Sequence, residues 1–155
     1  MKKKMLILAA LLVLAFIFLQ STVPEQRSDN ESIWFNARIM TPLLKRMGYS
    51  AVSGNVVRKA AHISEFFVLS LFAALIWKGR IIPSFYTGFT AAFLDESVQV
   101  IAQRGALITD VWIDLIGVAL GVLFGWMIFK AYDGMRRKMI KRKGVKAYEC
   151  QENQL

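Results

Sequence analysis

The sequence is poor in cysteine and in acidic residues. Its single cysteine, Cys150, excludes an intrachain disulfide and lies in a polar tail, where we expect an inert thiol. Eleven acidic residues stand against 20 basic ones, so the formal net charge is +9. The basic residues adjoin hydrophobic blocks, where they more often set membrane orientation than bind nucleic acid. We therefore expect no nucleic-acid partner.

A cleavage site is also missing after the first hydrophobic run. Three lysines follow Met1, and an apolar run continues over residues 5–20. Neither an Ala-x-Ala-like site nor a lipobox cysteine comes after it. We interpret this run as an uncleaved membrane span rather than a signal peptide.

Apolar residues are abundant and gathered into blocks: they make up 55% of the 155 residues, and the mean hydropathy is +0.42. Four runs can cross a bilayer, at about 5–20, 58–77, 81–102 and 107–132. The sequence therefore predicts an all-α membrane protein, a four-transmembrane-helix bundle forming a single domain over residues 1–134.

The distribution of lysine and arginine predicts the orientation of this bundle. The N-terminal lysines, the turn at 78–80 and the basic tail at 135–155 fall on one side of four spans. The positive-inside rule makes that side, with both termini, cytoplasmic. The loop at 21–57 then faces outward. Within it, residues 31–48 have helical apolar spacing interrupted by Pro42, which predicts an interfacial helix, with a partly ordered loop as the alternative.

Three glycines recur at four-residue spacing in the fourth span: Gly117, Gly121 and Gly125. Such a ridge of small residues lets another helix approach closely. We expect a helix-packing role for it, and the same ridge also permits a homo-oligomer.

Ionisable and amide side chains occupy the outer ends of three spans. Arg58, His62 and Glu65 share one helix face, because their spacing is i, i+4 and i+7. Each ionisable group costs roughly 2.5–3.5 kcal/mol at mid-membrane, so such groups pair or line a polar cavity. We expect the polar residues to converge in one outward-facing pocket. The candidate ligand-binding residues are Arg58, Lys59, His62, Glu65, Asp95, Glu96, Gln99, Arg104, Asp110 and Asp114.

The charges of this set do not balance. Three cations face five carboxylates when His62 is neutral. A protonated carboxyl, a protonated His62 or a bound cation would relieve the excess. We expect no cofactor, with a divalent cation as the alternative. Its ligands would be His62, Glu65, Glu96 and Asp114. A salt-bridge network that merely holds the helices in register is a further interpretation.

No serine or cysteine has a recognisable nucleophile setting. The candidate catalytic residues are therefore His62, a base oriented by Glu65, and Asp95 or Glu96 as the acid.

The order of these polar residues along the three spans resembles the VanZ-like family of small bacterial membrane proteins. The resemblance covers about residues 21–125. It rests on Arg58-Lys59-x-x-His62-x-x-Glu65-Phe66, Asp95-Glu96-x-x-Gln99, Arg104 and Asp110-Val111-x-x-Asp114-x-x-Gly117-x-x-x-Gly121. It implies a multi-pass protein of the bacterial cytoplasmic membrane, associated with resistance to the lipoglycopeptide teicoplanin.

Two functions follow as expectations. The first is a binding protein for an envelope lipid, a cell-wall precursor or a lipoglycopeptide, in which Arg58, Lys59 and Arg104 hold phosphate or carboxylate groups. The second is an intramembrane enzyme that modifies an envelope lipid or precursor. In both cases we expect membrane lipids as partners.

Overall fold

The computed structural model describes residues 3–23, 30, 33–46, 48, 53–102 and 108–152. Every regular element within these residues is a helix, which confirms the all-α prediction for this part of the chain. The elements are α1 (Lys3–Ser21), η1 (Asn36–Met40), α3 (Thr41–Arg46), α4 (Gly54–Ile76), α5 (Ile81–Ile101) and α6 (Ile108–Glu152).

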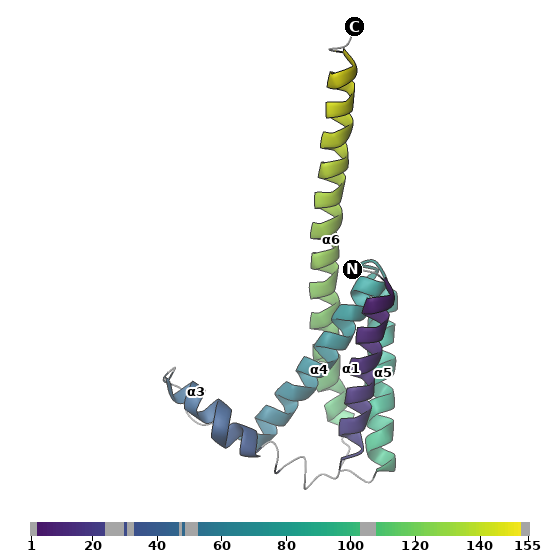
Figure 1. Ribbon diagram of the computed structural model, residues 1–155. Helices are drawn as coiled ribbons and strands as arrows, with labels where there is room; N and C mark the ends of the chain where they lie inside the picture. The colour runs from purple at the N-terminus through teal and green to yellow at the C-terminus, as the bar shows by residue number, and fades with distance from the viewer. Residues whose placement is uncertain are drawn as a thin grey trace.

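Four of these helices form a bundle: α1, α4, α5 and the first half of α6 (Figure 1). Helix α4 contacts the other three. The start of α1, the turn between α4 and α5, and the projecting half of α6 lie toward one end (Figure 1). The ends of α1 and α5 lie at the opposite end with the starts of α4 and α6, and we name this the polar end.

Within the described residues, three helical stretches are long and apolar enough to cross a membrane: Lys3–Ser21, Gly54–Ile76 and Asp110–Ile140. Helix α5 packs among them, and its 21 residues would extend over about 32 Å at 1.5 Å per residue. Helix α4 begins four residues before the predicted boundary at 58. Helix α6 continues past the predicted end at 132, because the following residues are rich in lysine, arginine and methionine and contain no proline.

The middle of the bundle is tightly packed. Phe66 of α4, Ala92 of α5 and Val118 of α6 are fully buried there. A Cβ atom on Gly117 or Gly121 would collide with the backbone carbonyl of a residue on α4. One on Gly125 would lie 2.6 Å from the side chain of Ala74 of α4. The glycine ridge therefore seats α6 against α4 of the same chain.

A helical segment precedes α4 and leaves the bundle near its start (Figure 1). The π-helical turn Asn36–Met40 ends two residues before Pro42, and the Thr41 amide donates to the Asn36 carbonyl. Pro42 lacks an N–H and disfavours a regular ladder, so a wider turn is the expected local solution. Trp34 and Phe35 are exposed. The segment is helical as expected, and its position on the membrane surface stays a prediction.

Candidate functional site

The polar end holds a cluster of buried polar side chains from all four bundle helices, which we name the polar centre. Its members at least nine-tenths buried are Ser21 of α1, Asp95, Glu96 and Gln99 of α5, and Asp114 of α6. His62 of α4 completes it, with 27% of its side chain exposed. Antiparallel packing brings the C-terminal turns of α1 and α5 together with the first turns of α6.

Asp95 is the best-anchored member of the polar centre. Its carboxylate accepts hydrogen bonds from the Ser21 hydroxyl and from Gln99 Nε2, the latter at 2.7 Å. Gln99 lies one turn further along α5, where i, i+4 side chains meet. The Ser21 hydroxyl also lies 3.0 Å from the Ile17 carbonyl oxygen. Two helices therefore fix the position of this carboxylate.

Asp114 meets His62 across the interface of α6 and α4. Asp114 Oδ1 lies 3.5 Å from His62 Nδ1, beyond the usual range of a hydrogen bond. Neither oxygen of Asp114 has a hydrogen-bond partner among the described residues, although its side chain is only 1% exposed. The expected orienting residue was Glu65. The structure places Asp114 against His62, because the tight packing of α6 on α4 brings it there, and the orienting role of Glu65 stays a prediction.

The other predicted carboxylates converge on the same region. Asp114 lies within electrostatic range of Asp95, Glu96, Asp110 and Glu65. Glu65 and Asp110 are half-buried. Glu96 is buried, and its two oxygens lack hydrogen-bond partners in the part of the chain that the structure describes. Five carboxylates from three helices thus share one end of the bundle.

The lysine and arginine side chains predicted to bind a ligand are less buried than the most buried carboxylates, where their burial is described. Arg58 is half-buried and interacts with other residues, whereas Lys59 is exposed. Arg104 lies outside the described residues. Among the residues whose burial is described, no lysine or arginine is buried. Within the described part of the chain, the buried carboxylates therefore have no equally buried cationic side chain beside them.

Reasoning from the sequence missed Ser21. Serine at the end of a hydrophobic run is ordinarily read as the first residue of a loop, and only the packing of α1 on α5 reveals its bond to Asp95.

A family profile described as VanZ/LLP1 matches residues 6–130. The chain belongs to the VanZ/LLP1 family. No curated protein and no solved structure matches it. The matched stretch contains every member of the polar centre.

Three groups of this VanZ/LLP1 chain are close enough to share an ion. One imidazole nitrogen of His62 and one carboxylate oxygen each from Asp95 and Asp114 all lie within 4.8 Å of one another. The ligands expected from the sequence included Glu65 and Glu96, and the geometry puts Asp95 in their place. One imidazole nitrogen with carboxylate oxygens is a donor set suited to first-row divalent cations.

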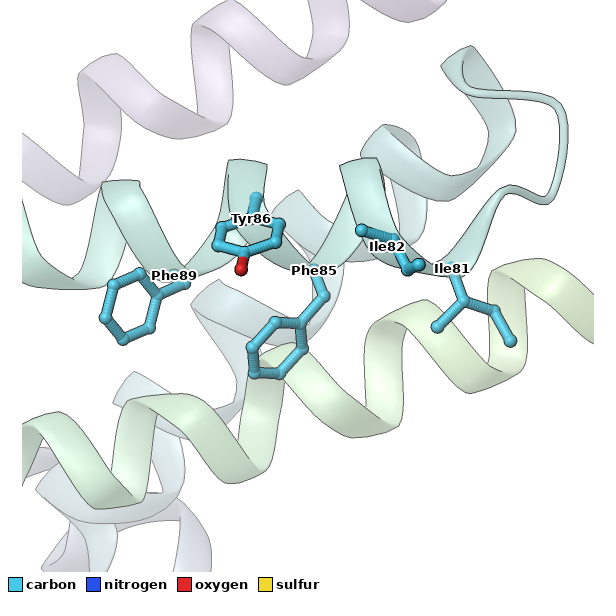
Figure 2. A pocket seen from close by; sticks show the side chains of 5 residues that line it. All are labelled: Ile81, Ile82, Phe85, Tyr86 and Phe89. Atoms are coloured by element: carbon cyan, nitrogen blue, oxygen red, sulfur yellow. The ribbon is translucent and has the colours of Figure 1, made fainter.

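An apolar groove of about 460 Å³ runs along the first turns of α5. Figure 2 shows its lining, with Phe85 pointing toward α6. The rings of Phe85 and Phe89 are stacked, with their centroids 6.4 Å apart. The five lining residues are Ile81, Ile82, Phe85, Tyr86 and Phe89. The lining contains no carboxylate, so the groove can take a hydrophobic chain.

Proposed function

We propose that this VanZ/LLP1 chain crosses the bacterial cytoplasmic membrane four times and binds an amphiphilic envelope molecule at its outer side. Helix α5 is the fourth span in this proposal. The start of α1, which contains Lys3 and Lys4, and the turn between α4 and α5, which contains Lys78 and Arg80, lie toward the bundle end opposite the polar centre (Figure 1). The positive-inside rule would make that end cytoplasmic, so the polar centre would face the outer leaflet.

The observation that carries this proposal is a polar-to-apolar track along α5. Phe89, Phe85 and Ile82 precede Glu96 by seven, eleven and fourteen residues. At about 100° per residue these four positions fall on one helix face. The apolar positions lie about 10–21 Å from Glu96 along the helix axis, at 1.5 Å per residue. This length fits the hydrocarbon chain of a molecule whose head lies at Glu96.

The head of the ligand would meet two kinds of side chain. The carboxylates of Glu96 and Asp114 lack hydrogen-bond partners among the described residues, so they can accept bonds from amine or hydroxyl groups. Arg58 and the adjacent Lys59 can hold phosphate or carboxylate groups, and Arg104, which lies outside the described residues, is a further candidate from the sequence. An envelope lipid, a lipid-linked cell-wall precursor and a lipoglycopeptide share this chemistry: a hydrocarbon chain joined to a polar head.

Teicoplanin provides the test, since it carries such a chain. We expect Arg58→Ala and Glu96→Gln each to weaken the binding of labelled teicoplanin to cells expressing the full chain by about tenfold, equivalent to about 1.4 kcal/mol. Susceptibility to teicoplanin should rise in parallel. Asp133→Asn is the matched control, since Asp133 forms an i, i+4 pair with Arg137 on α6, outside the polar centre. Unchanged binding and susceptibility in both variants, at normal membrane levels, would refute the proposal.

The pair of His62 and Asp114 favours a second candidate, an intramembrane enzyme acting on an envelope lipid or precursor. A histidine held by a carboxylate is suited to act as a general base. Glu96 would serve as the acid, because both oxygens of Asp95 already accept hydrogen bonds. Mass spectrometry of envelope lipids separates the two candidates: an enzyme predicts a product that accumulates with the wild-type chain and is absent with His62→Gln.

A further inference from the structure

We infer that His62, Asp95 and Asp114 form a binding site for one divalent first-row transition cation. The site joins α4, α5 and α6 at the polar end. It does not depend on which envelope molecule the protein binds, because the ligand atoms all belong to this chain.

The separation of His62 from Asp114 is the first argument. The nitrogen–oxygen distance of 3.5 Å is too long for a good hydrogen bond. Two ligand atoms bound at about 2.0–2.2 Å to one ion lie about 3.3–3.6 Å apart at a tetrahedral angle, so the separation of His62 from Asp114 already matches this spacing. All three ligand atoms lie within 4.8 Å of one another, and binding an ion would draw them closer together.

Unpartnered oxygens are the second argument. Both oxygens of Asp114 are buried without a hydrogen-bond partner in the described part of the chain, and so are both oxygens of Glu96. A buried polar atom in this state costs about 1–3 kcal/mol. Asp114 directs one of these oxygens at His62, into the ligand group. A cation between them would satisfy it.

Charge gives the third argument. Asp95, Glu96 and Asp114 are all at least nine-tenths buried, and among the described residues no buried lysine or arginine offsets them. A divalent cation supplies two positive charges at the point where the carboxylates converge. These two charges offset those of Asp95 and Asp114, and Glu96, within electrostatic range of both, would provide a further ligand.

The surroundings of Asp95 resemble the outer shell of a metal site. Ser21 and Gln99 each donate a hydrogen bond to its carboxylate, and such bonds orient a ligand before the ion arrives. Mixed nitrogen and oxygen donors favour Zn²⁺ or Mn²⁺ over Mg²⁺ or Ca²⁺, which prefer oxygen alone.

The test is the metal content of the full chain, purified in detergent through a tag that contains no histidine. The protein is stripped with a chelator, equilibrated with Zn²⁺ or Mn²⁺ and freed of excess metal. Elemental mass spectrometry should then find about one ion per chain. His62→Gln and Asp114→Asn should each lower the content at least tenfold. A wild-type chain that retains no ion, or variants that retain as much as the wild type, would overturn the inference.

Two further variants separate a defined site from general attraction to negative charge. Asp133→Asn removes a carboxylate outside the polar centre and should leave the content unchanged. Glu65→Gln removes a nearby carboxylate that is not in the ligand group, and it should retain most of the metal. A loss with Glu65→Gln as large as that with Asp114→Asn would contradict the proposed ligand set.

If the variants do not fold, X-ray absorption spectroscopy on the Zn²⁺-loaded wild-type chain identifies the atoms that bind the metal. The sequence has one histidine and one cysteine. An imidazole in the first shell must therefore be His62, and the remaining ligands should be oxygen. A sulfur ligand or the absence of imidazole would overturn the proposal. Metal content and teicoplanin binding are separate measurements, so either can fail without the other.

Discussion

The same helices build the middle of the bundle and its polar end, but the middle buries closely packed apolar side chains, whereas the polar end buries carboxylates. In the middle, Gly117 and Gly121 of α6 let two backbones approach, and the side chains of Val118 and Phe66 are completely buried. At the polar end, Asp114 and Glu96 are buried with oxygens that have no hydrogen-bond partner among the described residues. Close packing stabilises the fold, whereas buried ionisable groups in a membrane are costly and mark functional sites.

The largest expected effect comes from breaking the packed middle. Gly121→Leu places a side chain against the backbone of α4, and we expect a loss of roughly 3 kcal/mol or more, the upper part of the range for overpacked cores. Gly134→Leu is the control, since no atom lies within 4 Å of its Cβ position. Thermal unfolding in detergent, followed by circular dichroism, measures both. Equal melting temperatures for the two variants would show that the glycine ridge does not seat α6.

A smaller loss is expected at the anchored carboxylate of the polar end. Asp95→Ala leaves buried Gln99 without its acceptor and opens a small cavity. We expect a destabilisation of about 2 kcal/mol, within the cost of an unsatisfied buried group. The same unfolding measurement, performed in a chelator, tests it. No decrease in melting temperature would mean that Asp95 does not hold α1 and α5 together.

The smallest expected change in stability is an increase rather than a loss. Asp114→Asn keeps the volume of the side chain and removes a buried charge whose oxygens lack hydrogen bonds. A buried polar group without a hydrogen-bond partner costs about 1–3 kcal/mol, so neutralising this carboxylate should stabilise the fold by about 1 kcal/mol. We therefore expect a higher melting temperature in metal-free buffer, and a smaller stabilisation by added Zn²⁺ than in the wild type. A lower melting temperature in chelator would contradict the view that Asp114 is unsatisfied without a ligand.

The positions of the helices could largely be predicted from the sequence. Hydrophobic runs locate α1, α4 and α5 to within a few residues, because a bilayer-length apolar stretch must bury its backbone in a helix. The end of α6 could not be predicted this way. Hydropathy marks where a membrane span stops, while helical propensity carries the backbone on to Glu152.

The candidate site was predictable in its location but not in its contacts. Spacing along one helix shows which side chains share a face, and antiparallel order shows which helix ends meet. Neither fixes how far each helix is rotated or tilted against its neighbours. For that reason neither the contact of Asp114 with His62 nor the hydrogen bond from Ser21 to Asp95 could be predicted.

The sequence by itself determined the family, the helical class and the collection of acids at one end, since these depend on composition and on the order of residues. Tertiary structure alone decided which of those acids are hydrogen-bonded and which are left without a partner. The physical reason is the glycine contact between α6 and α4. That contact sets the depth at which Asp114 enters the bundle, and a shift of one residue would turn its side chain by about 100°.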